Sequence, residues 1–206
     1  MNYLAHAFLA GPVDSDRVGG VVGDFVKGLL APPPPALSPA LVAGVALHRS
    51  IDSFADRHPA FQRSRARVSA ARRRVAGIMV DMFYDHFLAA HWDRLRGLAG
   101  LEGDLSAFTA QTYRLIAAHG TNLPPAFMPV FARMAADDWL AAYRDPATVA
   151  LALDRMAVHR LRRPNPLAGA GEELWHDYAG FEEDCLGFLP DALAWVATVR
   201  AERGAG

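Results

Sequence analysis

The stretch from residue 48 to residue 86 opens with His48-Arg-Ser-Ile-Asp52 and closes with Asp81-Met-Phe-Tyr-Asp85-His86. Side chains four residues apart share a face of an α-helix, so His48 pairs with Asp52 and Asp81 pairs with Asp85. Both pairs lie among apolar residues that are typical of buried helices. Because a buried carboxylate is costly without a partner charge, a hydrogen-bond donor or a cation, we expect two facing helices that hold a metal ion.

Proline, glycine and capping residues around this stretch predict an all-α fold, a helical bundle in a single domain over residues 1–206. No strand pair or hairpin turn is predicted. Stiff or irregular connectors are expected at 31–36, 121–125 and 162–166. The tail 172–203 is expected to form two helices separated at Pro190. The other expected helices span residues 2–10, 14–30, 38–56, 59–77, 77–96, 104–120, 126–135, 138–143 and 145–161.

Composition places the chain among globular proteins, with 52% hydrophobic and 21% charged residues in 206. The net charge of −1 gives no general attraction for nucleic acid or for an anionic membrane, so neither is an expected partner. Cys185 is the single cysteine, which excludes an internal disulfide and fits a reducing, cytoplasmic setting. No signal peptide and no apolar stretch of about 20 residues is recognised, so we expect a soluble protein.

Seven acidic and imidazole side chains form a candidate ligand set without a thiolate. An N/O set of this kind favours Mn²⁺, Mg²⁺ or Fe²⁺, and Zn²⁺ less exclusively. Asp24 interrupts a glycine-rich apolar segment, and Gly19, Gly20 and Gly23 indicate that another backbone comes close there. Two simpler interpretations stay open: His48 and Asp52 as an ordinary helical contact, and His6 as a core histidine. The set consists of His6, Asp24, His48, Asp52, Asp81, Asp85 and His86.

Positive side chains suggest where anions bind. Lys27 and Arg49 lie beside candidate ligands and either neutralise them or reach a phosphate. A run of arginines between residues 63 and 74 has no acidic neighbour, and its simplest interpretation is a solvated helix face. Few aromatic residues interrupt it, which disfavours nucleic acid, so an acidic protein partner is preferred. Spacing places Arg63, Arg67 and Arg74 on one stripe.

With these residues in view, the chain resembles the acyl carrier protein phosphodiesterases, also called acyl carrier protein hydrolases. The likeness covers roughly the first 95 residues and is looser afterwards, as at Trp139-Leu140 and Tyr143-Arg144. The proline run 32–35 departs from it. The matching blocks are MNYLAH at 1–6, GDFVKG at 23–28, HRSID at 48–52, RRVA at 73–76, DMFYDHFL at 81–88 and HW at 91–92.

This resemblance implies an atypical helical relative of the metal-dependent His-Asp (HD) phosphohydrolases. The implied reaction removes 4′-phosphopantetheine from the serine of holo acyl carrier protein, with Mn²⁺ preferred. We therefore predict phosphate binding by Lys27 and Arg49, and docking of the acidic carrier by Arg63, Arg67 and Arg74. The predicted metal ligands are Asp24, His48, Asp52 and Asp85, and the predicted catalytic residues are His86, His6 and Asp81.

Two other functions remain open at this point. One is a phosphohydrolase that acts on a nucleotide or another small phosphodiester, which a substrate panel would separate. The other is a non-catalytic module that binds carrier protein, in which the Asp and His side chains form a structural polar network. Metal analysis of the purified protein distinguishes that module from an enzyme.

Overall fold

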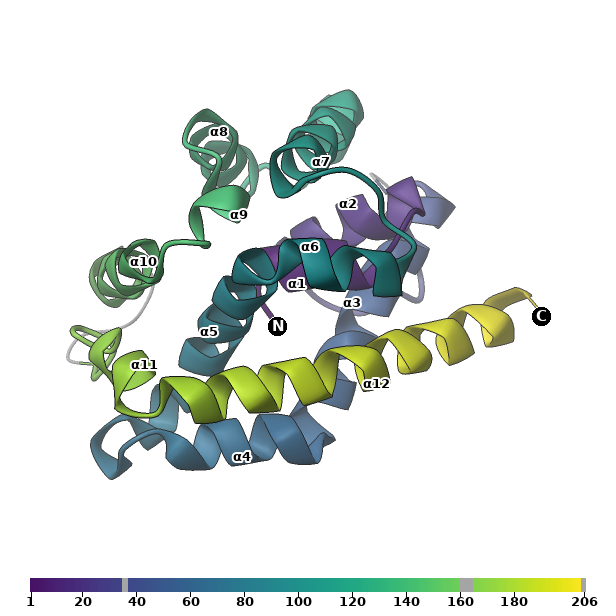
Figure 1. The fold of residues 1–206 in the computed structure, drawn as a ribbon. Coiled ribbons are helices and arrows are strands. Elements are labelled where there is room, and N and C mark those ends of the chain that lie inside the picture. The colour runs from purple at the N-terminus through teal and green to yellow at the C-terminus, as the bar shows by residue number, and fades with distance from the viewer. Residues whose placement is uncertain (35–36, 160–164, 205–206) are drawn as a thin grey trace.

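The computed structural model describes residues 1–34, 37–159 and 165–204, and within these ranges it is all-α with no strand, which confirms the predicted class (Figure 1). Short 3₁₀ helices lie at Gly23–Phe25, Ala70–Val75, Arg96–Ala99 and Gly120–Asn122. The α-helices are α1 (Tyr3–Leu9), α2 (Asp14–Val22), α3 (Pro39–Arg57), α4 (Pro59–Arg67), α5 (Ala76–Ala90), α6 (Trp92–Leu95), α7 (Leu105–His119), α8 (Met128–Ala136), α9 (Trp139–Ala142), α10 (Pro146–His159), α11 (Glu172–His176) and α12 (Tyr178–Gly204).

Helices α1 and α5 form the centre of the molecule. Every residue of α1 is buried, and so are most residues of α5. The long α12 lies beside α4 and also packs on α3 and α5, while its C-terminal end projects from the body (Figure 1). Polar side chains on α1 and α5 are therefore enclosed, and each needs a partner inside the protein. Among the described residues, no helix is long and apolar enough to cross a membrane.

Glycines allow α2 and α3 to pack with their backbones in contact. A Cβ atom on Gly19 would lie 2.4 Å from the carbonyl carbon of Gly44, and one on Gly44 would lie 2.4 Å from the oxygen of Ser15. A Cβ atom on Gly20 would lie 3.1 Å from the oxygen of His6 in α1. The close approach predicted from the glycines is thus confirmed, and it brings α1, α2 and α3 together.

Several predicted boundaries were wrong. Helix α2 ends at Val22 rather than at residue 30, because the chain tightens into a 3₁₀ turn that carries Asp24. The arginine run leaves the α-helix after Arg67 and continues as a 3₁₀ helix, and the helix expected over 77–96 divides at His91.

The tail also differs from the prediction. Pro190 does not separate two helices; it lies on the exposed side inside α12, while neighbouring Phe188, Leu189 and Ala192 are buried. That apolar packing offsets the amide hydrogen bond that proline cannot donate. The predicted linker 162–166 and the end of its preceding helix lie largely outside the described residues, as does part of the proline loop.

Candidate active site

Two histidines form the base of the site. The rings of His6 in α1 and His48 in α3 stack with centroids 3.8 Å apart, and the two residues are 1% and 4% exposed. Nδ1 of His48 lies 2.8 Å from the carbonyl oxygen of Gly20. This contact fixes the ring so that Nε2 faces Asp52 at 3.2 Å and Asp24 at 3.5 Å. A histidine held through one nitrogen presents the other one to a ligand.

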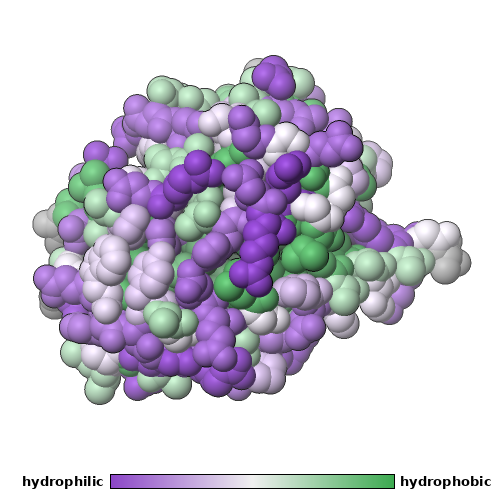
Figure 2. Space-filling view, viewed as in Figure 1, coloured by the Kyte–Doolittle hydropathy of each residue, from purple (hydrophilic) through white to green (hydrophobic). Residues whose placement is uncertain are grey.

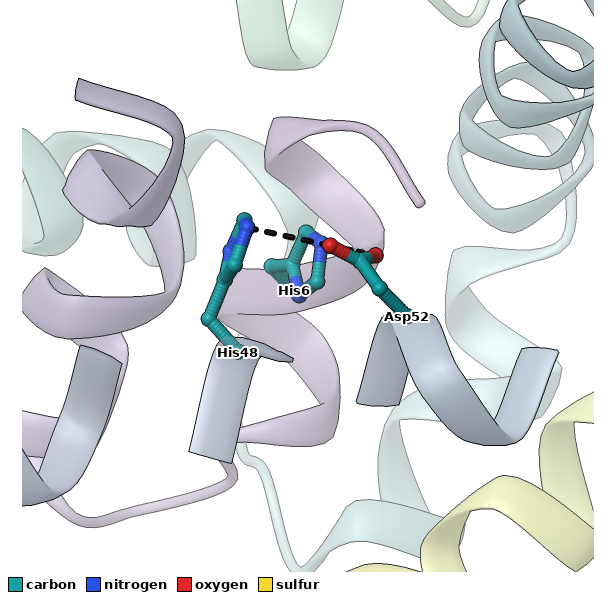
Figure 3. A group of neighbouring side chains, drawn as sticks. All are labelled: His6, His48 and Asp52. Atoms are coloured by element: carbon teal, nitrogen blue, oxygen red, sulfur yellow. Dashed lines mark ion pairs between the residues drawn. The ribbon is translucent and has the colours of Figure 1, made fainter. Parts of the chain in front are cut away.

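Two carboxylates form the rim above these rings. The side chain of Asp52 is 37% exposed and that of Asp24 is 56% exposed. Oδ1 of Asp52 lies 3.1 Å from Nε2 of His6, and its other oxygen faces His48. Figure 3 shows Asp52 to one side of the two imidazoles, with dashed lines marking its contacts with both. The buried side of the site therefore consists of imidazole rings, and the carboxylate side is open to solvent.

Electrostatics give the two rings opposite protonation states. Burial and neighbouring His48 lower the pKa of His6 to about 3, so His6 is neutral near pH 7. Burial also opposes the charged form of His48, but hydrogen bonds to Asp24 and Asp52 outweigh it and raise the pKa of His48 to about 9. Burial disfavours the carboxylate of Asp52, yet the adjacent imidazoles and the Met1 amino group lower its pKa well below the usual range.

These atoms lie close enough together that they could hold a metal ion. One ligand atom from each of His6, His48 and Asp52 lies within 4.8 Å of the others. Neither ring nitrogen of His6 makes a hydrogen bond of normal geometry within the described part of the chain. A buried imidazole without such a bond is costly, and coordination of a cation would satisfy it. Two imidazole nitrogens with one or two carboxylates suit Mn²⁺, Fe²⁺ or Zn²⁺.

The N-terminus and Asp81 extend the cluster toward α5. The amino group of Met1 lies 2.8 Å from Asp52 and 3.1 Å from Asp81. Burial lowers the pKa of this amino group, but the charges of Asp81 and Asp52 raise it overall to about 11. Burial raises the pKa of Asp81. Asp81 therefore lies beside the ligand group through Met1, a link for which the sequence pattern gave no signal.

Asp85 lies outside this ligand group. Its Oδ2 accepts hydrogen bonds from Nδ2 of Asn2 at 2.8 Å and from the amide of Leu4 at 3.0 Å, and its Oδ1 accepts one from the amide of Ala5 at 2.8 Å. Burial dominates over these bonds and raises its pKa to about 7. Asp85 thus anchors the first turn of α1, the helix that carries His6. This geometry favours a positioning role, and the ligand role of Asp85 stays a prediction.

His86 is also separate from the cluster. Its Nδ1 lies 3.0 Å from the carbonyl oxygen of Tyr143, and its Nε2 lies 2.9 Å from the hydroxyl of Tyr178. Burial lowers its pKa. The ring therefore connects α5 to the segment after α9 and to α12. The predicted proton transfer by His86 would require one of these contacts to break.

Residues 1–192 match the sequence profile of the family described as acyl carrier protein phosphodiesterase. The chain belongs to the acyl carrier protein phosphodiesterase family. The match extends well beyond the first 95 residues, where the motifs were recognised.

Three similar proteins carry the name acyl carrier protein phosphodiesterase. The one from Serratia proteamaculans is 35% identical over 193 residues, which cover 94% of this chain and 96% of the relative. Those from Photorhabdus laumondii and Yersinia pestis are each 35% identical over 195 residues; the matches cover 95% and 94% of this chain and 90% and 96% of the relatives. No solved structure matches the chain.

In this member of the acyl carrier protein phosphodiesterase family, the two predicted phosphate-binding residues differ in their contacts. Arg49 donates to the carbonyl oxygen of Val26 at 2.8 Å and so fastens the turn after Asp24 to α3. Lys27 is exposed on the same turn and has no ion-pair partner in the described part of the chain. Lys27 is therefore the cation of this pair that is available to an anion.

The predicted docking arginines also separate into two groups. Arg63 and Arg67 contact the buried carboxylate of Asp184 in α12 at 2.7 Å and 2.9 Å, and Arg67 also pairs with Asp177. Arg74 is exposed on the 3₁₀ helix that follows α4. Figure 2 shows hydrophilic residues along the lower edge of the molecule, where α4 lies. Arg63 and Arg67 thus have a structural role, while docking stays a prediction for all three.

Proposed function

We propose that the protein hydrolyses the phosphodiester bond between 4′-phosphopantetheine and the serine of holo acyl carrier protein, giving apo acyl carrier protein. We further propose that the reaction depends on a divalent metal, Mn²⁺ first and Mg²⁺ or Fe²⁺ as alternatives, and takes place in the cytoplasm. The observation that carries this proposal is the His6, His48 and Asp52 group, with buried imidazoles below and a carboxylate rim open to solvent. Membership of the family indicates which substrate to propose, namely acyl carrier protein.

His6, His48 and Asp52 would hold the cation. When bound, the cation supplies positive charge that neutralises the phosphodiester and makes water more acidic. His6 is neutral near pH 7 and needs to lose no proton to serve as a ligand, because burial keeps its pKa at about 3. His48 has Nδ1 directed at Gly20, which leaves Nε2 facing the site. Asp85 positions His6 through the first turn of α1.

Asp24 and Lys27 would act on the exposed side. Lys27 would bind a phosphate oxygen, since it follows the 3₁₀ turn that carries Asp24, is exposed, and has no acid partner among the described residues. Water forms the new bond to phosphorus, the bond from phosphorus to the serine oxygen breaks, and the proton lost by water ends on the serine oxygen. Asp24, which lies at the rim 3.5 Å from Nε2 of His48, would accept that proton first, and general-base catalysis contributes roughly 10²–10⁴-fold.

The direct test is incubation of holo acyl carrier protein with the enzyme and Mn²⁺, followed by mass spectrometry of the carrier. We expect the carrier to lose the mass of the prosthetic arm and to return to the apo form, with the arm released as the phosphate. An unchanged holo carrier, together with hydrolysis of small phosphodiesters, would reassign the enzyme to a small-molecule substrate. An unchanged carrier with no metal bound would support a non-catalytic module.

Metal affinity is expected to rise with pH. The pKa of His48 in the metal-free protein is about 9, so Nε2 carries a proton at pH 7 that coordination must displace. Mn²⁺ affinity should increase about tenfold per pH unit below 9 and level off above it. Calorimetric titration in buffers of different ionisation enthalpy should detect release of about one proton at pH 7. Affinity that is the same at pH 7 and pH 9 would contradict coordination by His48.

Carrier docking is best tested at Arg74. Arg74→Glu should raise KM by about tenfold and weaken its dependence on salt, because a steering charge facing an acidic partner is reversed. Arg94→Glu, an exposed arginine on α6, is the matched control and should leave KM unchanged. Substitution of Arg67 is a poorer test, since it removes a partner of buried Asp184 and destabilises the fold. An unchanged KM in Arg74→Glu would remove Arg74 from the docking surface.

A further inference from the structure

A groove with a cavity volume of about 470 Å³ lies between helices α8–α10 and the start of α1 with α5. Figure 1 shows α8, α9 and α10 together on one side of α1 and α5. Volumes of roughly 300–1,000 Å³ are typical of sites that enclose small molecules. Apolar side chains supply most of the wall, among them Val130, Trp139, Leu151, Ala152 and Met156.

One end of the groove adjoins the candidate active site. Asn2 and Met82 line the groove, and Nδ2 of Asn2 lies 3.0 Å from the sulfur of Met82. Asn2 follows Met1 in the chain and Met82 follows Asp81. The amino group of Met1 lies 3.1 Å from Asp81. The amino group of Met1 is 2.8 Å from Asp52. The groove therefore begins at residues that directly follow Met1 and Asp81 in the chain, next to the contacts of the Met1 amino group with Asp52 and Asp81.

Two arginines give the groove polar donors. Arg133 of α8 and Arg155 of α10 both line it, and neither forms an ion pair with another described residue. A guanidinium presents five N–H donors and accepts none. The two guanidinium groups therefore favour a ligand that carries carbonyl or anionic oxygens. His86 fixes a further wall residue by its contact with the carbonyl oxygen of Tyr143 at 3.0 Å.

We propose that this groove binds the pantetheine arm of the prosthetic group together with an acyl group carried on its sulfur. The inference rests on the proposed function, because the phosphate end must lie at Asp52. The arm is a linear chain with methyl groups and two amides, so it matches an apolar wall with donors at Arg133 and Arg155. The acyl chain extends along Leu151 and Met156.

The first test measures binding without catalysis. S-octanoylpantetheine and pantetheine, which lack the phosphate, are titrated into the metal-free protein while tryptophan fluorescence is recorded. We expect a saturable change that is lost in Trp139→Phe, with the octanoyl compound binding about tenfold more tightly than pantetheine because it buries more apolar surface. Trp92, Trp175 and Trp195 lie outside the groove and supply the constant background.

The second test fills the groove. Ala152→Phe should reduce kcat/KM for holo acyl carrier protein by about tenfold or more, because an arm that cannot bind no longer positions the phosphate. Mn²⁺-dependent hydrolysis of bis(p-nitrophenyl) phosphate, which has no arm, should stay within about twofold of wild type. Ala147→Phe, an exposed position on the same helix, is the matched control. Leu151→Trp, at a side chain 48% exposed, repeats the test should Ala152→Phe fold poorly.

The possible outcomes distinguish failure of the groove proposal from failure of the proposed hydrolysis. Absence of any Trp139-dependent change, or wild-type kcat/KM in both groove-filling variants, would overturn the proposal even if the enzyme cleaves holo carrier protein. Conversely, a wild-type enzyme that leaves the holo carrier intact would refute the proposed function, while binding of S-octanoylpantetheine would still support the groove. A fluorescence change with an acidic carrier peptide in place of either pantetheine compound would assign the groove to the carrier protein instead.

Discussion

Asp52→Asn is expected to lower kcat/KM for holo acyl carrier protein by about 1,000-fold, equivalent to about 4 kcal/mol of transition-state stabilisation. Asp52 contacts both imidazoles, at 3.1 Å from His6 and 3.2 Å from His48, and it supplies the negative charge of the ligand group. The amide keeps the shape of the side chain and removes its charge. Mn²⁺ binding should weaken in parallel, which calorimetry measures independently of turnover.

The matched control is Asp56→Asn, one helical turn further along α3. Its side chain is 70% exposed and makes only a long contact of 3.5 Å with Arg65. We expect its activity and its Mn²⁺ affinity to stay within about twofold of wild type. If Asp52→Asn retained Mn²⁺ affinity while Asp56→Asn lost it, the cation would lie elsewhere on α3 and the ligand assignment would fail.

Gly23→Ala should reduce hydrolysis by about 100-fold, because it displaces the ring that faces the rim carboxylates. A Cβ atom on Gly23 would lie 2.4 Å from Cγ and 2.6 Å from Nδ1 of His48. The ring must move, and it then loses its contact with the carbonyl oxygen of Gly20 and its stacking on His6. Overpacking of this kind also lowers the free energy of unfolding by about 1–3 kcal/mol.

Gly77→Ala provides the comparison for this substitution. A Cβ atom there meets nothing within 4 Å, and the position lies in the first turn of α5. The alanine should leave activity unchanged and raise the melting temperature slightly, since glycine costs roughly 0.5–1 kcal/mol in a helix. Wild-type hydrolysis by Gly23→Ala would mean that the observed orientation of His48 is unnecessary for the reaction.

Local patterns predicted the elements better than their long-range contacts. The His48 and Asp52 spacing correctly placed both side chains on one face, and the glycines before Asp24 correctly indicated a close backbone. The Asp81 and Asp85 spacing also gave a shared helix, but spacing cannot distinguish a metal ligand from a carboxylate that caps another helix. Asp85 caps α1 from more than 80 positions away in the chain, and no local signal reports such a partner.

Local sequence patterns also fail to report which charged side chains pair with each other in the fold. The arginine run lacks acids nearby, yet Asp184 lies 121 positions from Arg63 and balances it across the interface between α4 and α12. The groove likewise depends on helices from both halves of the sequence, and the residues of α8 and α10 carry no motif. Pro190 favoured a helix break by propensity, and packing of α12 against α3, α4 and α5 overrode that preference.

The central claim is that one cation is held by His6, His48 and Asp52. Anomalous diffraction from a crystal grown with Mn²⁺, recorded at the manganese absorption edge, tests it most directly. The account predicts a single strong peak within coordination distance of Nε2 of His48 and a carboxylate oxygen of Asp52, with a nitrogen of His6 also bound. A peak bound to Asp81 and Asp85 without these imidazoles, or no peak while the enzyme still cleaves holo carrier protein, would contradict it.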